Sequence, residues 1–155
     1  MLLKMLPDQI SDQWETIWPA IEIVVPANIA GPRARANILH ELMNGNMQCW
    51  IMKGNDNDDV YALATTCFFN DPSGTRSLFI YSLYGFRPIT LEMWTSAFDT
   101  LRQWASSLGC VTIMSHTSSA KMIRLTDYLG GDTSNVIAIL NVQKNGKLKG
   151  VDNGS

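Results

Sequence analysis

Residues 76–116 constrain the fold of this chain more than any other stretch. They read as a strand at 76–84, a short turn at 85–90 with Gly and Pro, a long amphipathic helix at 90–108 and a second strand at 110–115. Two strands joined through a helix of this length form a parallel crossover, which brings the turn and the helix N-terminus to one end of a sheet. Small molecules bind at that end in such folds, so an active site is expected near residues 85–90.

The segments around the crossover complete a mixed α/β (α+β) pattern. Helical spacing of apolar residues predicts a helix at 8–21, which kinks or restarts at Pro19, and a second helix at 32–44. A first strand around residues 1–6 is either short or missing. Polar turns separate three strands of an antiparallel meander, and a short helix and a last strand follow the crossover. The remaining predicted bounds are 47–53, 60–70 and 76–84 for the meander, 117–129 for the short helix and 135–142 for the last strand.

Composition favours one globular domain, at residues 1–142, followed by a polar tail at 143–155 that stays loose or orders on a partner. The chain has 155 residues, of which 46% are hydrophobic and 17% are charged. A net charge of -2 and a pI near 5.6 give no electrostatic reason to expect nucleic acid or an anionic membrane as a partner. No apolar run approaches the roughly 18–20 residues that span a bilayer, so a soluble protein made in the cytoplasm is expected.

Two residue clusters that suggest metal or redox chemistry have simpler interpretations. Cys49, Cys67 and Cys110 lie far apart inside apolar runs and form no Cys-x-x-Cys pair, which is typical of buried, reduced thiols in an intracellular protein. The polar segment 54–59 contains three aspartates but lacks the spacing and the glutamate of a calcium loop. It is interpreted as a solvated hairpin loop rather than a metal site.

Several short pieces occur in a characteristic order. Trp18 and Pro19 adjoin in the first helix, residues 42–50 run from a helix through Gly45 into a strand with Trp50, and residues 104–110 end the long helix. A Leu-Gly pair at 129–130 closes the last helix. This order resembles the GNAT fold, that of the GCN5-related N-acetyltransferases, and more closely the small GNAT-like proteins that tailed bacteriophages encode near their structural genes. The resemblance covers about residues 8–142. It implies a mixed sheet with an antiparallel meander, a β-α-β crossover and a C-terminal helix and strand.

The resemblance implies a site for acetyl-CoA at the turn after the fourth strand. In the family a Gln/Arg-x-x-Gly-x-Gly/Ala turn and the next helix N-terminus hold the pyrophosphate. Here Gly85 is the only glycine, Pro88 lacks an N–H group, and Ser82 stands where Gln or Arg is usual. Either this is an altered CoA site, or the glycine serves only backbone geometry and the arginine of the turn is solvated. The candidate cofactor-binding residues are Leu83, Gly85, Arg87 and Thr90.

Two side chains are candidates for proton transfer. His116, at the end of the fifth strand, is either a base or substrate contact, or a strand-end residue that caps a helix or faces solvent. Many active members have a Tyr three residues before the closing Leu-Gly, where this chain has Thr126. Tyr128 is displaced by two positions onto another helix face, and it serves either as the acid for the leaving thiolate or in packing.

Three functions remain open at this point. The first is transfer of an acetyl or acyl group from acyl-CoA to an amine of a host protein, peptide or small molecule. The second is a catalytically silent GNAT-fold protein that binds other proteins, such as a minor structural or assembly component of a virion or a homo-oligomer. The third is a phage protein that binds and inhibits a host factor. These functions imply the host cytoplasm, or the virion for a structural component, and none of them involves nucleic acid or a membrane.

Overall fold

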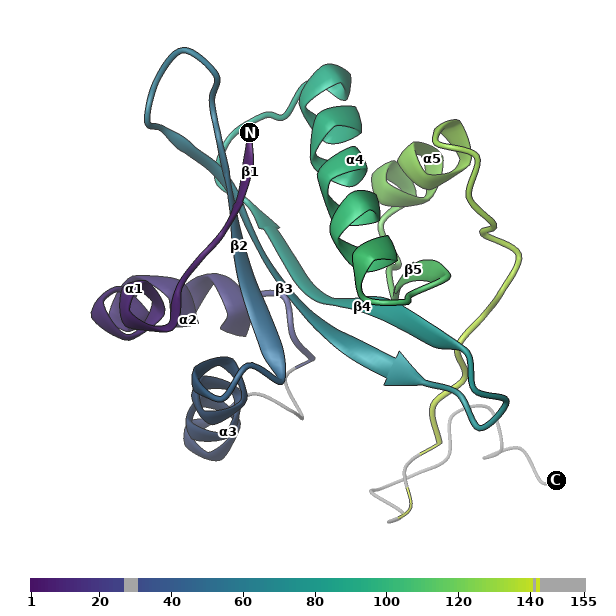
Figure 1. The fold of residues 1–155 in the computed structure, drawn as a ribbon, viewed down its shortest axis with the longest axis horizontal. Helices are drawn as coiled ribbons and strands as arrows, with labels where there is room; N and C mark the ends of the chain where they lie inside the picture. Colours follow the sequence, from purple (N-terminus) through teal and green to yellow (C-terminus); the bar gives the residue numbers. More distant parts are fainter. Residues whose placement is uncertain (27–30, 141, 143–155) are drawn as a thin grey trace, which may run out of the picture. The chain divides into compact units, whose positions relative to one another are not determined.

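The computed structural model describes residues 1–26, 31–140 and 142, which divide into two compact units (Figure 1). The first unit, Met1–Thr117, holds a five-stranded sheet, and the second begins at Ser118. None of the helices in this described part has the length and apolarity that crossing a membrane requires. The first unit contains β1 (Leu2–Lys4), α1 (Pro7–Asp12), α2 (Trp14–Glu22), α3 (Pro32–Met43), β2 (Met47–Lys53), β3 (Val60–Asn70), β4 (Arg76–Gly85), α4 (Leu91–Ser107) and β5 (Thr112–Ser115); the second contains α5 (Ala120–Tyr128).

The sheet of the first unit is mixed and has a simple strand order. Strands β1 to β4 pair antiparallel with their neighbours in sequence, and β5 pairs parallel with β4. The parallel pair follows from the crossover through α4. A helix of 17 residues carries the chain back to the end of the sheet at which β4 begins, so β5 runs in the same direction as β4. Helix α4 covers one face of the sheet, and α1, α2 and α3 cover the other (Figure 1).

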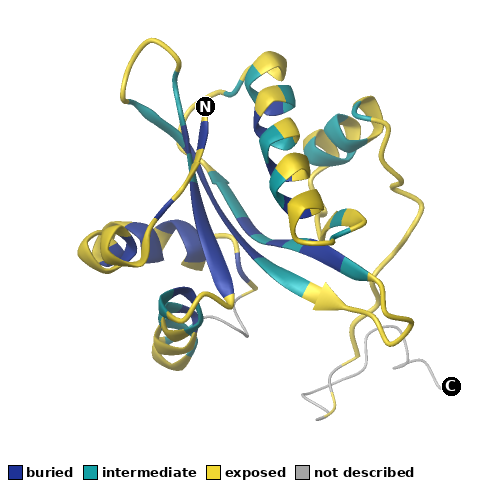
Figure 2. Cartoon of the chain, viewed as in Figure 1, coloured by how far each residue is buried: buried dark blue, intermediate teal, exposed yellow. Residues whose placement is uncertain are grey.

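The main apolar core lies on the face that α1, α2 and α3 cover. Helices contribute side chains at 3–4 residue spacing, and β2 and β3 contribute alternate residues, as the periods of the two structures require. Burial is greatest where the helices face the sheet (Figure 2). The core includes Ile10, Ile17, Ile21, Leu42 and Cys49, none of which is more than 2% exposed.

The meander, α3, α4 and the parallel crossover confirm the prediction from sequence. Thr90 caps α4, and its hydroxyl accepts a hydrogen bond from the N–H of Met93 at 3.2 Å. Gly45 follows α3 with a φ of 82°, the left-handed conformation that ends helices. A short first strand, β1, pairs with β2.

Pro19 does not interrupt the first helical segment, contrary to the prediction. The break falls at Gln13, between α1 and α2, and Pro19 lies inside α2. Proline removes the hydrogen bond to the carbonyl group four residues earlier, which here belongs to Glu15. Glu15 is exposed, so its carbonyl group lies on the solvent side of the helix, where losing an internal partner costs least.

Two strand predictions near the end of the chain are wrong. Residues 135–140 and 142 form no strand, although their apolar, β-branched sequence is typical of one. The mostly apolar sequence of strand β5 is typical of a central parallel strand buried on both faces, yet three of its four residues are exposed. The two errors are linked. Since the residues after α5 add no strand to the described sheet, β5 is an edge strand and not a central one. Helix α5 begins later than the predicted residue 117, because Ser119 is its capping residue. The expected tail at 143–155 lies outside the described residues.

Burial of Cys49 predicts a loss of stability at alkaline pH. The side chain is fully buried in β2, and burial raises the pKa of its thiol to about 12. In the unfolded chain a thiol ionises near pH 8.5. The stabilisation is therefore complete below about pH 8.5 and is lost as the pH rises toward 12, by about 1.4 kcal/mol per pH unit. Urea unfolding between pH 8 and 11 should show this slope, and Cys49→Ala should reduce it; an equal slope in both proteins would contradict the assignment.

Candidate functional site

Strand β4 separates from β5 halfway along its length. The parallel pairing runs from Ser77 opposite Thr112 to Ile80 opposite Ser115 and stops there. Strand β4 continues to Gly85, paired on its other side with β3. Among the described residues no strand pairs with the outer edge of β4 from residue 81 to 85. Such an edge presents unpaired backbone N–H and C=O groups, to which an extended ligand can bind as an added strand.

A β-bulge lies where the two strands part. Thr66 pairs with Ile80 and Thr65 pairs with Ser82, so Tyr81 is an extra residue in β4. A bulge bends its strand and is frequent next to active sites, because it redirects side chains. The buried hydroxyl groups of Thr65 and Ser82 lie 2.6 Å apart and bond to each other beside it. The position therefore combines a free strand edge with a local bend.

His116 lies at the same point on the other strand. It is the first residue after Ser115, the last residue of β5 that pairs with β4. Its ring contacts the ring of Phe79 edge to face, with centroids 4.7 Å apart. This contact holds an exposed imidazole against β4. The gap between the two strands begins directly after the pair of Ile80 and Ser115, at Tyr81 on β4 and at His116 on the segment that follows β5. The structure thus places this predicted site residue at the opening between β4 and β5.

The turn after β4 leads into the N-terminus of α4. The N–H of Phe86 donates to the carbonyl oxygen of Tyr61 at 2.8 Å, and Pro88 has no N–H. The available donors are then at most the N–H groups of residues 87, 89 and 90 and those of Leu91 and Glu92 at the start of α4, because the N–H of Met93 already donates to the hydroxyl group of Thr90. The helix dipole adds positive potential at this point. Anions bind at such termini, so the donor set fits a phosphate group with fewer donors than a glycine-rich turn provides.

Gly85 is not required by the backbone of this turn. Its φ lies outside the left-handed region, and a Cβ atom there would meet only the carbonyl oxygen of Arg87 and the Cδ1 of Ile89, both at 3.8 Å. These are ordinary contact distances. The local packing would therefore accept alanine, so neither the backbone conformation nor the packing of the turn requires glycine here.

Two charged side chains near the turn work against anion binding. The guanidinium group of Arg87 pairs with the carboxylate of Asp59 at 2.8 Å and lies 5.7 Å from the ring of Tyr61. Glu92, in the first turn of α4, places a negative charge at the positive end of the helix. The ion pair of Arg87 is about half exposed, and such pairs contribute only about 0–1 kcal/mol. A phosphate group that forms a charge-assisted hydrogen bond can compete with a pair of this strength.

Leu83 contributes to this region in two ways. Its backbone belongs to the free edge of β4, while its side chain lines a cavity between α4 and the sheet. The cavity measures about 30 Å³, little more than the space of one water molecule, and its lining is apolar. The side chain therefore packs between α4 and the sheet. Only the backbone groups of Leu83 remain available at the free edge of β4.

Tyr128 lies elsewhere in the chain. It is the last residue of α5, in the second unit, and it is 67% exposed. Its predicted role as an acid stays a prediction. Within residues 1–26, 31–140 and 142, no three histidine, cysteine or carboxylate side chains gather in a way that could hold a metal ion.

Several solved structures that superpose on this chain are acetyltransferases. The chain superposes on a probable acetyltransferase with a TM-score of 0.68, 10% identity, and coverage of 94% of this chain and 99% of that one. A predicted acetyltransferase with acetyl-CoA from Clostridium acetobutylicum gives 0.67, 18% identity, and coverage of 91% and 95%. AAC(6')-Iy, in complex with the bisubstrate analogue CoA-S-monomethyl-acetylneamine, gives 0.66, 13% identity, and coverage of 93% and 98%. No family model and no curated protein matches the sequence.

The chain has the GNAT fold. At 10–18% identity these similarities concern the fold alone, and they agree with the mixed sheet and the crossover predicted from sequence. The prediction from sequence missed the bulge at Tyr81, which lies where β4 separates from β5. The sequence carries no clear signal for this bulge, because the residues of β4 permit pairing with β3 with or without it.

Proposed function

We propose that this GNAT-fold chain binds acyl-CoA along the free edge of β4 and transfers its acyl group to an amine. The observation that carries this proposal is the separation of β4 from β5 after Ile80, which opens beside His116 and continues to the N-terminus of α4. One ligand with an extended amide-containing arm and a diphosphate matches an open strand edge followed by a helix N-terminus. Acetyl-CoA in a solved structure of the same fold supports this choice of ligand.

The residues of this chain would have separate roles. Backbone groups of β4 at residues 81–85 bind the arm, while Arg87, Thr90 and the first N–H groups of α4 hold the diphosphate. The thioester supplies an activated acyl group when acyl-CoA is bound. His116 accepts the proton that the attacking amine loses as its nitrogen bonds to the carbonyl carbon. A backbone N–H at the bulge polarises the carbonyl oxygen of the thioester.

Replacing Arg87 with Ala should weaken acetyl-CoA binding about three- to tenfold, less than a buried charged contact contributes, because the guanidinium group is half exposed and already paired with Asp59. Two measurements test this. Acetyl-CoA should first raise the melting temperature of the unmodified protein, because a ligand that binds only the folded state stabilises it. Calorimetric titration should then show the loss of affinity in R87A.

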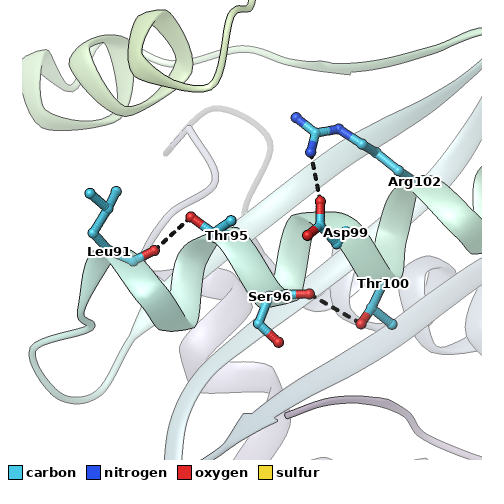
Figure 3. Close-up of polar contacts among 6 residues, drawn as sticks. All are labelled: Leu91, Thr95, Ser96, Asp99, Thr100 and Arg102. Carbon is cyan, nitrogen blue, oxygen red and sulfur yellow. Dashed lines mark hydrogen bonds and ion pairs between the residues drawn. The ribbon is translucent and has the colours of Figure 1, made fainter.

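Arg102→Ala is the matched control for this prediction. Both arginines are 49% exposed and pair with one aspartate, but Arg102 pairs with Asp99 on the polar side of α4, beyond its first turn (Figure 3). R102A should keep the original affinity, although it removes the same charge. Equal affinity of R87A and the unmodified protein would overturn the placement of the diphosphate. No change of melting temperature at millimolar acetyl-CoA would overturn the proposed function.

A second candidate function is supported by a different observation. The side chains of Val136, Ile139 and Leu140 are each more than 80% exposed, and exposed apolar groups of this density mark protein-binding surfaces. They support a catalytically silent GNAT-fold protein of a tailed phage that assembles with virion components or with its own copies. Mass spectrometry of purified particles should then find the chain in a fixed copy number. Its absence from particles would remove the virion form of this proposal.

A further inference from the structure

The loop between β2 and β3, residues 54–59, holds Asp59 at a fixed position. The carbonyl oxygen of Asp59 accepts a hydrogen bond from the N–H of Gly54 at 3.1 Å, and its own N–H donates to the side-chain oxygen of Asn57 at 3.1 Å. Glycine at position 54 permits this arrangement, because a Cβ atom there would lie 2.5 Å from the same oxygen of Asn57. Both backbone polar groups of Asp59 are therefore used inside the loop, and its carboxylate remains for a partner outside it.

That partner is Arg87, in the turn between β4 and α4. The carboxylate of Asp59 accepts a hydrogen bond from the guanidinium group at 2.8 Å, although the two residues are 28 positions apart. Backbone pairing supports this contact, since the N–H of Phe86 donates to the carbonyl oxygen of Tyr61 at 2.8 Å and so joins the turn to the start of β3. Both side chains of the ion pair are about half exposed, 49% for Arg87 and 43% for Asp59. An anion from solvent can therefore reach the guanidinium group and exchange with the carboxylate.

The donors at the start of α4 differ from Arg87 in this respect. They are backbone N–H groups, and those of Leu91 and Glu92 have no acceptor within the helix. A single phosphate group can bind to them and leave the ion pair of Arg87 with Asp59 intact. A diphosphate is longer, and when its second phosphate group reaches Arg87 it must replace the carboxylate, because two anions at one guanidinium group repel each other. The ion pair thus affects the binding of ligands with two adjacent phosphate groups and not of those with one.

We infer that Asp59 competes with the diphosphate of CoA for Arg87 and thereby limits the affinity of this site for CoA. The inference rests on the proposed function and adds an affinity-determining residue to it. Asp59 contacts neither the acyl group nor the amine, and it acts only through the arginine. Removing its charge leaves the guanidinium group free to bind phosphate with a charge-assisted hydrogen bond. CoA then binds more tightly, which is the opposite of what the loss of a ligand-binding residue causes.

Calorimetric titration of the full chain with two ligands tests this inference. Acetyl-CoA carries the diphosphate, and S-acetyl-phosphopantetheine has the same thioester arm with one phosphate group. Asp59→Asn should raise the affinity for acetyl-CoA about two- to fivefold, the contribution of a half-exposed ion pair, and leave the affinity for S-acetyl-phosphopantetheine unchanged. Asp58→Asn is the matched control, because it removes the same charge from the same loop, but Asp58 pairs with Lys53 at 3.6 Å. It should leave both affinities unchanged.

Each other outcome identifies what has failed. If the unmodified protein binds acetyl-CoA and D59N binds it equally or less tightly, the role of Asp59 is overturned while the proposed function stands. An equal gain in D58N, or an equal gain for S-acetyl-phosphopantetheine, would also overturn it, because the net charge of the loop would then account for the effect. Adding D59N to R87A should give no further gain, and a gain there would show that Asp59 does not act through Arg87. If neither the unmodified protein nor D59N binds acetyl-CoA, the proposed function itself is overturned.

Discussion

Replacing Trp50 with Ala should lower the free energy of unfolding by about 3–5 kcal/mol, among the largest losses for any single residue of this chain. The side chain is only 3% exposed, and its ring meets that of Trp104 edge to face at 5.0 Å, which joins β2 to α4. It also lines the small apolar cavity beneath α4, so its removal enlarges that cavity. Residual cavity volume adds to the lost transfer energy.

Hydrogen bonds increase the cost of this substitution. The indole N–H of Trp50 donates to the hydroxyl oxygen of Thr66 at 2.9 Å, and that hydroxyl donates to the side chain of Gln48 at 2.9 Å. Trp50→Phe keeps an aromatic ring but removes the donor, so about 1–2 kcal/mol should be lost. Phe69→Ala, at an exposed position of β3, is the control and should cost less than about 1 kcal/mol. Urea unfolding measures all three, and a loss below 2 kcal/mol in W50A would contradict this account.

Local patterns were sufficient to predict most elements of the first unit, although they placed the break between α1 and α2 at Pro19 instead of Gln13. Helix α4 carries a capping residue, Thr90, and an apolar stripe at 3–4 residue spacing, and Gly109 with a φ of 79° follows it. These signals depend on neighbours within one or two turns. The crossover then follows from chain length alone, because two strands joined by such a helix must run parallel.

The details of the site depend on pairing between distant residues. The bulge at Tyr81 is a one-residue shift between β3 and β4, and the alternating sequence of β4 permits pairing with or without it. The ion pair of Arg87 with Asp59 joins residues 28 positions apart. Neither feature can be predicted from one segment alone. The sequence therefore predicted the position of the turn but not the ion pair of Arg87 with Asp59.

The exposed β5 illustrates a different limit. Its apolar residues indicate burial, yet Met114 is exposed in the structure, as is Val111 directly before the strand. An apolar sequence shows which side chains a strand could bury. Whether they are buried depends on the strands and helices that pack against it. The same holds for residues 135–140, whose apolar side chains support the second candidate function because no strand of the described chain pairs with them.

His116→Ala should reduce the turnover number for acyl transfer by about 10²- to 10⁴-fold, the usual contribution of a general base. The expected loss is in kcat, because His116 lies at the opening between β4 and β5 and not at the α4 N-terminus, where the diphosphate is proposed to bind. The KM for acyl-CoA should therefore change little. Release of free thiol from acetyl-CoA, measured with a panel of primary amines, gives both constants.

His40 provides the control, since the chain has only two histidines. It lies on α3, which packs against β2, and its side chain is exposed. His40→Ala should keep full activity, which separates a general effect of losing a histidine from an effect at the site. If H116A is as active as the unmodified protein, the amine loses its proton to water or to another group, and His116 is not the base. If KM rises with kcat unchanged, the imidazole binds the substrate and takes no part in proton transfer.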